Sequence, residues 1–412
     1  MVTTTIHDLH REKNNLGMHY AVEKLRFVKK SYIFVPILIF VFMLRRFAVS
    51  NFKCFENEFV LDFAHPNGYT FNSECVRHGI VNAAMVYGYN GTGKSNLGLA
   101  IFDVIEHLTD KRRDESSYRN YLNASSRQKY ASFSYEFQIG DTVVRYDYQK
   151  SSYKILEYES LSIDGQEVIW FDRRDGNDVF DVLLPGTENL NRVIGDMSLS
   201  VLKYIKNNSS LDDSKWNMAF KGFYSFVERM LFFRSLEDRT FIGLEISSTY
   251  LRDDIIASGL ENFEAFLKEA DLDFKLSLED RGDKQEIMAD FGEKRLPFFQ
   301  IMSTGTSSLT LFYCWFQRLN KSQVSLLFID EFDAFYHNKL SRKLIEMLKD
   351  SGVQFVVTTH NTSIMTNELL RPDCYYLINK KEIRPLSDCT DRELREVHNI
   401  EKIYKSGAFD NE

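Results

Sequence analysis

Apolar and polar residues alternate along much of the chain, and the period of the alternation changes from segment to segment. Every second residue is apolar at 47–49 and again at 59–63, which predicts a pair of half-buried strands. A continuous apolar run at 80–87 predicts a buried strand, and apolar residues then recur at helical spacing from 97 to 108. The residues between this strand and this helix are rich in glycine. The pattern therefore predicts a strand, a glycine loop and a helix.

The middle of the chain changes from a sheet pattern to a helical one. Residues 130–173 alternate in segments separated by glycine and aspartate turns, which predicts an antiparallel meander. Residues 191–270 are mainly of helical pattern, and strands are predicted again at 274–291. One apolar stripe in the helical part consists of Phe220, Phe223, Tyr224, Val227, Met230 and Leu231. Such a stripe is typical of the core face of a helix.

The last third alternates between buried strands and a helix. Strands are predicted at 326–329 and 353–359, with a helix between them that ends near Gly352. Both ends of the chain thus indicate one α/β domain that is interrupted by a β and helical insertion. The predicted parts are an extension at 1–42, an N-terminal lobe at 43–150, the meander and helical insertion at 151–294, and a C-terminal lobe at 295–412.

The N-terminus carries an apolar run of thirteen residues, from Tyr32 to Leu44, flanked by basic pairs. Spanning a bilayer as a helix takes about 20 residues, and the start lacks the features of a signal peptide. A short membrane anchor, a buried strand or helix, an interaction arm, and residues upstream of a true start at Met43 all remain open. We favour the start at Met43, because an ordered strand pattern begins there.

Charge and cysteine content narrow the functional classes. With 51 basic and 59 acidic residues the 412-residue chain has a net charge of -8, which argues against a protein that coats nucleic acid by bulk charge. Its five scattered cysteines are typical of reduced thiols and predict a cytoplasmic protein. Cys54, His65, Cys75 and His78 could be four zinc ligands, but only the last two have tight spacing, so we favour a strand and its loops.

The glycine loop at 88–95 matches the phosphate-binding pattern G-x-x-x-x-G-K-[ST] in full and lies between a predicted strand and helix. Backbone N–H groups of such a loop surround phosphates, Lys94 reaches the β and γ phosphates, and Ser95 holds Mg²⁺. The predicted phosphate-binding residues are Gly88, Asn90, Gly91, Thr92, Gly93, Lys94, Ser95 and Asn96.

Three further groups follow predicted elements. Asp330 ends an apolar strand, where its carboxylate can hold Mg²⁺, and Glu331 is then placed to orient or deprotonate the attacking water. His360 ends the next strand and is predicted to contact the γ-phosphate. The segment 303–306 opens a helix with a serine and a glycine, which is a second potential anion site.

Taken in order, these motifs resemble the ATPases of the ATP-binding-cassette class. Residues 88–95 resemble Walker A, 330–331 resemble Walker B with its catalytic glutamate, 332–335 the D-loop, and His360 the switch histidine. Residues 303–306 resemble the signature motif, and this resemblance implies that Ser303, Gly305 and Thr306 bind nucleotide. The resemblance implies an α/β P-loop ABC-type head with an antiparallel or mixed β subdomain and a helical insertion.

Within that class the chain resembles the SMC, RecF and OLD-related branch, whose members often begin with a pattern like residues 51–55, and this adds Lys53 to the nucleotide site. Residues 394–409 are similar to the tail of compact bacterial ATPases of abortive-infection systems, such as the AbiL and RloB-associated ATPases. The resemblance extends from Met43 to about Phe409.

The resemblance implies ATP and Mg²⁺ as cofactors and a homodimer or higher homo-oligomer, in which two heads enclose two ATP molecules. Ser303 and Gly305 would then act on the partner's nucleotide. The sequence departs from the transporter signature at Thr304 and Thr306. No glutamine is clearly placed as the Q-loop residue, and Gln128 and Gln138 are only nearby candidates.

The predicted function is a cytosolic ATPase that senses or regulates in anti-phage defence. Its effector, a nuclease or toxin, would be encoded nearby, its trigger would be DNA or a phage protein, and membrane association is not expected. A DNA-repair or chromosome-maintenance head is the alternative, and a transporter domain is a third. The chain has no coiled coil between 95 and 303, which argues against a complete SMC protein.

A nuclease within the chain itself is not favoured. Only about fifty residues follow His360, too few for a further domain of ordinary size. Arg392 and His398 have the spacing of a HEPN-type ribonuclease motif, but no helical domain surrounds them. A helix face of mixed charge is the simpler interpretation.

Overall fold

The computed structural model describes residues 41–111, 115–234, 241–243, 251–282, 284–319 and 324–409. Residues 1–40 of the predicted extension at 1–42, and with them most of the apolar run at 32–44, lie outside these residues. The end of the run is described, because strand β1 spans Phe42–Ser50. Met43 is buried there and is the second residue of the strand.

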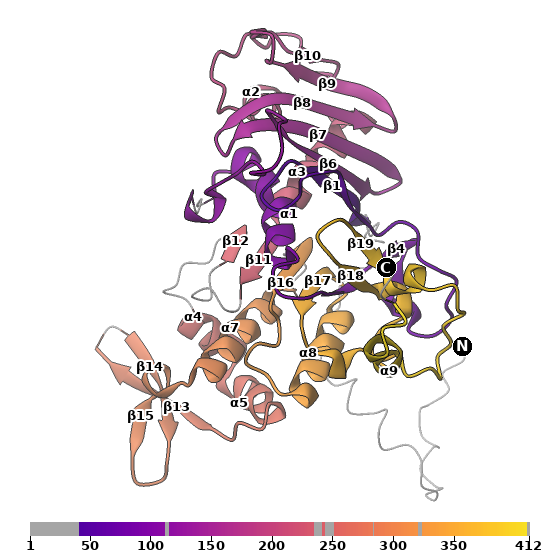
Figure 1. Cartoon of the computed structure of the whole chain (residues 1–412). Coiled ribbons are helices and arrows are strands. Elements are labelled where there is room, and N and C mark those ends of the chain that lie inside the picture. Colours follow the sequence, from indigo (N-terminus) through magenta and orange to yellow (C-terminus); the bar gives the residue numbers. More distant parts are fainter. Residues whose placement is uncertain are drawn as a thin grey trace, which may run out of the picture. The chain divides into compact units, whose positions relative to one another are not determined.

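The first large sheet is antiparallel throughout and has the strand order β10-β9-β8-β7-β6-β1-β2 (Figure 1). Burial alternates along β6, so one face of this antiparallel sheet is packed and the other is more open. The predicted meander is confirmed. The strands are β1, β2 (Phe59–Asp62), β6 (Ala131–Ile139), β7 (Thr142–Ser152), β8 (Ile155–Ile163), β9 (Gln166–Asp172) and β10 (Asp181–Val182).

The second large sheet, the mixed sheet, has the order β12-β11-β16-β17-β5-β18-β19. Its five central strands are parallel, and the two edge strands are antiparallel to their neighbours. The carboxyl ends of the central strands therefore meet at one edge. The strands are β5 (Ala83–Tyr87), β11 (Leu231–Arg234), β12 (Phe241–Gly243), β16 (Leu326–Asp330), β17 (Gln354–Thr359), β18 (Tyr375–Ile378) and β19 (Ile383–Pro385).

Helix α1 (Lys94–Leu108) lies between the two sheets (Figure 1). Toward the mixed sheet, a Cβ added at Gly98 would lie 2.7 Å from the Phe232 ring and 2.9 Å from the Phe328 ring. Toward the antiparallel sheet, Asp103 of α1 and Lys150 of β7 form a fully buried ion pair at 2.8 Å. The helix is thus held tightly on both sides.

The remaining helices cover the two sheets or form a separate group. Helix α3 packs on β1, β6 and β7, while α4, α5 and α7 pack together and α5 and α6 contact a three-stranded sheet, β13 to β15. These elements are α2 (Val201–Asn208), α3 (Lys215–Glu228), α4 (Leu251–Ser258), α5 (Leu260–Glu269), β13 (Lys275–Arg281), β14 (Lys284–Asp290), β15 (Arg295–Pro297), α6 (Phe298–Ile301), α7 (Thr304–Leu319), α8 (Asn338–Ser351) and α9 (Ile400–Lys405). The short strands β3 (Val76–Arg77) and β4 (Ile80–Val81) pair with each other.

The predicted α/β class with an antiparallel sheet and a helical insertion is confirmed. The predicted division into lobes stays a prediction, and its boundary at 150 falls inside β7. The prediction that the whole apolar stripe lies on one helix was wrong at its end, because α3 stops at Glu228 and Leu231 begins β11. The helix ends there because the 231–234 segment pairs with β16 instead.

The prediction of a helix face at 392–398 was also wrong. These residues form turns and loops. The Asn367 side-chain amide donates to the carbonyls of Arg395, Glu396 and His398, at 2.8, 3.2 and 3.3 Å. Carbonyls that accept from this amide are held in a loop conformation, and only the short helix α9 follows.

Candidate nucleotide-binding site

The glycine loop at 88–95 connects β5 to α1 at the carboxyl edge of the mixed sheet. Gly91 and Gly93 have positive φ angles of 77° and 106°, which side chains rarely adopt. A Cβ at Gly88 would lie 2.5 Å from the Ile378 side chain. The Lys94 Nζ donates to the carbonyls of Gly88 and Tyr89, at 2.9 and 3.2 Å, so the loop closes around the ammonium group.

The acid pair lies on β16, two strands from the loop. Asp330 ends the strand and is buried, and its carboxylate accepts a hydrogen bond from the Thr358 hydroxyl at 2.7 Å. The same hydroxyl accepts from the Glu331 backbone N–H at 2.8 Å. Glu331 has a φ of 49°, a left-handed conformation that is costly for glutamate. Thr358 of β17 therefore fixes both the carboxylate and the strained backbone beside it.

His360 follows β17, the strand between those of the loop and the acid pair. The charges of Lys94, Asp333 and Asp330 all act on its imidazole. Burial lowers the pKa of Lys94, and the nearby Asp330 and Glu331 carboxylates oppose this effect. The structure therefore brings Lys94, the acid pair and His360 together at one sheet edge.

We expect the pKa of His360 to lie below its ordinary value in the nucleotide-free protein. His360 is an exposed residue whose imidazole is partly withdrawn from water, and this partial burial is the main cause; the Lys94 charge adds to it, while Asp333 and Asp330 act in the opposite direction. Because the folded pKa is depressed, the unfolded state binds more protons, and the contribution of His360 to stability falls as the pH drops through the ordinary histidine range.

An NMR titration of the imidazole, assigned with His360→Asn, checks this expectation. Lys94→Ala should move the pKa of His360 upward, because it removes a neighbouring positive charge. A pKa at or above the ordinary value in the unmodified protein would contradict the arrangement.

The predicted metal ligands are the Ser95 hydroxyl, at the start of α1, and the Asp330 carboxylate. Both present oxygen atoms, which are the ligands that Mg²⁺ prefers. The buried Asp330 is not paired with a cation in an ion pair among the described residues, so its charge stays available at the sheet edge. This donor set fits Mg²⁺.

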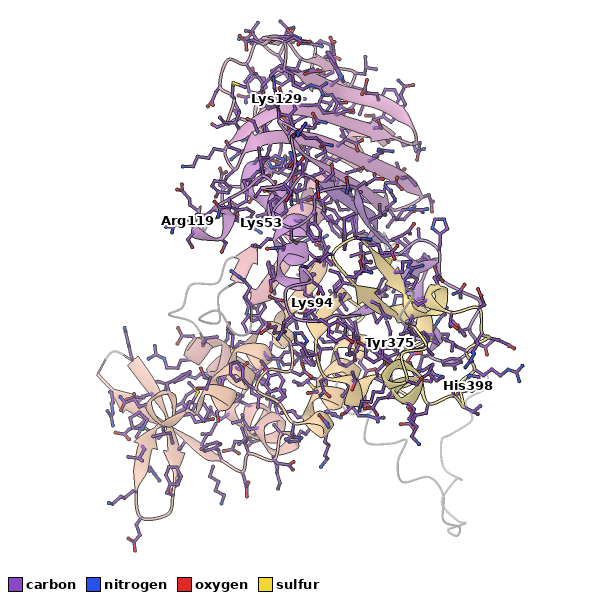
Figure 2. All side chains as sticks on the ribbon, viewed as in Figure 1. Lys53, Lys94, Arg119, Lys129, Tyr375 and His398 are labelled. Atoms are coloured by element: carbon purple, nitrogen blue, oxygen red, sulfur yellow. The ribbon has the colours of Figure 1, made fainter. Side chains whose placement is uncertain are left out.

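Lys53 lies in the tight turn that follows β1. Asn51 and Lys53 have positive φ angles of 52° and 46°. The next residue, Cys54, lies against the glycine loop, because its sulfur accepts from the Asn96 amide at 3.2 Å and lies 2.8 Å from where a Cβ of Gly93 would be. Figure 2 shows Lys53 on the same side of the molecule as Arg119, with Lys94 below. Cys54 and Asn96 thus lie at the loop, Lys53 directly precedes Cys54, and the nucleotide-binding role of Lys53 and Asn96 stays a prediction.

The signature-like segment lies at the start of α7. The Ser303 hydroxyl accepts from the Thr306 backbone N–H at 3.1 Å and caps the helix. A Cβ at Gly305 would lie 3.5 Å from the carbonyl of Phe335, and the Tyr336 hydroxyl bonds to Ser308 at 2.8 Å. The start of α7 is thus placed against the loop that follows the acid pair through Gly305 and Ser308.

The two glutamines considered for the Q-loop have other surroundings. Gln138 lies on β6, where its side chain accepts from Arg45 at 2.7 Å and donates to the Gly140 carbonyl at 2.8 Å. The carbonyl of Gln128 accepts from the Asn51 amide at 2.9 Å. Neither glutamine lies on the strand that flanks β16 on the side away from β17. That strand is β11, and its last residue, Arg234, stands beside Asp330.

Two residues at this edge were missed from the sequence. Thr358 stands two positions before His360 in a strand that was recognised, so its inward-facing hydroxyl was a usable signal. Arg234 offered no such signal, because β11 was interpreted as part of a helix.

Residues 83–366, more than half of the chain, match the family described as "AAA domain, putative AbiEii toxin, Type IV TA system". The chain belongs to this family. The match includes the glycine loop, the acid pair and His360 of this AAA domain. No curated protein matches the sequence.

Solved SMC head domains are similar to this AAA-domain chain. An SMC head bound to the C-terminal winged-helix domain of ScpA shows 16% identity and a TM-score of 0.42, covering 82% of this chain and 96% of its own. The SMC head domain from Thermotoga maritima shows 15% sequence identity and a TM-score of 0.39, and the match covers 83% of this chain and 98% of that one. A head with an extended coiled coil bound to the C-terminal domain of ScpA, derived from Pyrococcus furiosus, shows 14% and 0.42, covering 83% and 96%. Similarity at this level assigns no activity.

Within the described ranges, no three or more His, Cys, Asp or Glu side chains are grouped so that they could hold a metal ion. His65 instead pairs with Asp62 at 2.9 Å. None of the helices in the described part of the chain is both long and apolar enough to cross a membrane.

Proposed function

We propose that this protein binds ATP with Mg²⁺ and hydrolyses it to ADP and phosphate. The observation that carries the proposal is the meeting of Lys94, the Asp330–Glu331 pair and His360 at one edge of the mixed sheet. Their charges act on one another across three neighbouring strands. A phosphate loop, a metal-binding carboxylate and a base beside it are the parts that phosphoryl transfer to water requires.

Each residue has a role in this mechanism. The N–H groups of the loop and the start of α1 hold the phosphates, and Lys94 leaves the Gly88 and Tyr89 carbonyls to bind them. Ser95 and Asp330 would hold Mg²⁺, which would supply positive charge to neutralise the phosphates. Glu331 takes a proton from the attacking water, in a position that Thr358 fixes. His360 donates a hydrogen bond to the γ-phosphate.

We further propose that two heads enclose two ATP molecules, so that Ser303 and Gly305 complete the partner's site. Ser303→Arg is then expected to block hydrolysis, because it removes the cap of α7 and places a bulky side chain in the shared site. The decisive measurement mixes this variant with Lys94→Ala. Each variant alone is inactive, but a mixed dimer contains one complete site. The mixture should regain a measurable part of the wild-type rate, up to about a quarter, because at random pairing half of the dimers are mixed and each has one of its two sites complete.

The mixing experiment distinguishes a site that two chains share from a site that lies within one chain. Mixed variants that stay inactive, although both are folded, would show that Ser303 serves its own chain. Normal turnover by Ser303→Arg alone would show that 303–306 is not a signature. Thermal melting of each variant checks that the helix α7 still folds.

We propose a sensing or regulating role in anti-phage defence, with a separate nuclease or toxin as effector. The matching family description, which names a putative AbiEii toxin and a type IV toxin–antitoxin system, supports this role. Co-expression with the proteins encoded next to it, followed by co-purification with and without ATP, tests it. An ATPase rate that rises with added DNA, without such a partner, would favour the DNA-repair alternative.

A further inference from the structure

Arg234 stands at the carboxyl end of β11, outside every motif described above. It pairs in register with Asp330 of β16, so the two Cα atoms are about 4.8 Å apart, the spacing of neighbouring strands. The strand order places it on the side of Asp330 opposite β17 and His360. Arg234 therefore borders the region where the terminal phosphate of a nucleotide on the loop would lie.

The face of the strand shows where the Arg234 side chain points. Phe232, two residues earlier, contacts α1, and its ring is 2.7 Å from where a Cβ of Gly98 would be. Side chains two positions apart on a strand share a face. The Arg234 guanidinium is 6.0 Å from the Phe232 ring centroid and only 6% of the residue is exposed. It is therefore on the α1 side of the sheet, at the end where the phosphate loop begins.

A short segment holds this guanidinium next to a second cation. Arg234 Nη1 donates to the Ser117 hydroxyl at 3.0 Å, and Lys53 Nζ donates to the Arg119 carbonyl at 3.1 Å. Ser117 and Arg119 are two residues apart, so the two cations that bond to them lie close together. Burial lowers the pKa of Lys53 most, and the Arg234 charge lowers it further. Lys53 is in turn next to Cys54, which packs on the glycine loop.

We propose that Arg234 binds the γ-phosphate of ATP, together with Lys53, from the side opposite His360. The inference rests on the proposed function. A guanidinium has five N–H donors and no acceptor, so it cannot ligate Mg²⁺, but it bonds phosphate oxygens in pairs. Arg234 thus distinguishes ATP from ADP, since only ATP presents the phosphate that it reaches.

Nucleotide affinity of Arg234→Gln tests the proposal. We expect ATP with Mg²⁺ to bind about 10- to 100-fold more weakly, as for a lost charged hydrogen-bond pair, and ADP affinity to change much less. Arg145→Gln is the matched control, because Arg145 is half exposed and pairs with Asp147 on the antiparallel sheet. Ser117→Ala keeps the guanidinium but removes its anchor, so it should weaken ATP binding by a smaller factor.

Arg234→Lys is the second variant if the glutamine variant folds poorly, and it should recover part of the ATP affinity. Unchanged ATP affinity in the folded glutamine or lysine variant would overturn the proposal. An equal loss of ATP and ADP affinity would also overturn it, since a structural role moves both. If the wild-type protein bound neither nucleotide, the proposed function itself would fail. Wild-type binding that is lost in Lys94→Ala but kept in Arg234→Gln would reject only this inference.

Discussion

Lys94→Ala is expected to abolish ATP binding, with a loss in affinity of about 100-fold or more. The ammonium group is the loop's own buried cation, and in the nucleotide-free protein it is held by two loop carbonyls. Exchange of these carbonyls for phosphate oxygens provides two charge-assisted hydrogen bonds. Alanine removes both, and it leaves the backbone N–H groups as the main remaining contacts.

Isothermal titration measures the affinity, and thermal unfolding gives an independent reading. Wild-type protein should gain about 2.7 kcal/mol of stability when ATP is present at about 100 times its Kd, whereas a variant that binds about 100-fold more weakly should gain only about 0.4 kcal/mol or less. Lys405→Ala is a matched control, because this exposed lysine pairs with Glu401 far from the loop in sequence. Unchanged nucleotide affinity in a folded Lys94→Ala protein would exclude the loop as the phosphate site.

Glu331→Gln is expected to keep ATP binding and to slow hydrolysis by about 100- to 10,000-fold, the usual contribution of a general base. Glutamine has the same shape, and the backbone N–H at this position keeps its hydrogen bond to the Thr358 hydroxyl. The variant should therefore retain the left-handed φ of 49° and lose only the ability to accept a proton. ATP then persists between the heads, and a dimer accumulates.

Rapid-mixing kinetics measure the hydrolysis step, and light scattering with ATP measures the mass. Glu393→Gln is a control of the same chemistry at an exposed pair with Arg395. A variant that binds ATP and remains a monomer would contradict the two-head arrangement. A variant that hydrolyses ATP at the wild-type rate would instead remove Glu331 from the role of base.

Much of the site could be predicted because its parts are encoded locally. The glycine loop follows a run of apolar residues, and Asp330 ends another, so each motif carries its own strand as context. Parallel strands then bring their carboxyl ends to one edge, and this is why residues as distant as Lys94 and His360 meet. Lys53 was placed by resemblance, and its turn is stabilised by the buried Asn51 amide.

The parts of the fold and of the site that could not be predicted depend on pairing between segments distant in sequence. Residues 231–234 continue an apolar stripe at helical spacing, and only β16 on one side and β12 on the other make them a strand. Arg234 consequently had no assigned position. The same applies to Asp103 and Lys150, because nothing in either local pattern indicates that they form a buried ion pair.

The close approach at Gly98 restricts how α1 can move. With two phenylalanine rings against its backbone and a buried ion pair on its other side, the helix cannot turn about its axis without breaking one of these contacts. Its first residue is Lys94, and β7 lies at the far side of the ion pair. We expect both contacts to resist a displacement of the start of α1, where the phosphate loop ends. A side chain at Gly98 would press on the Phe232 and Phe328 rings of the mixed sheet, so this small residue sets how closely the helix that begins with Lys94 approaches that sheet.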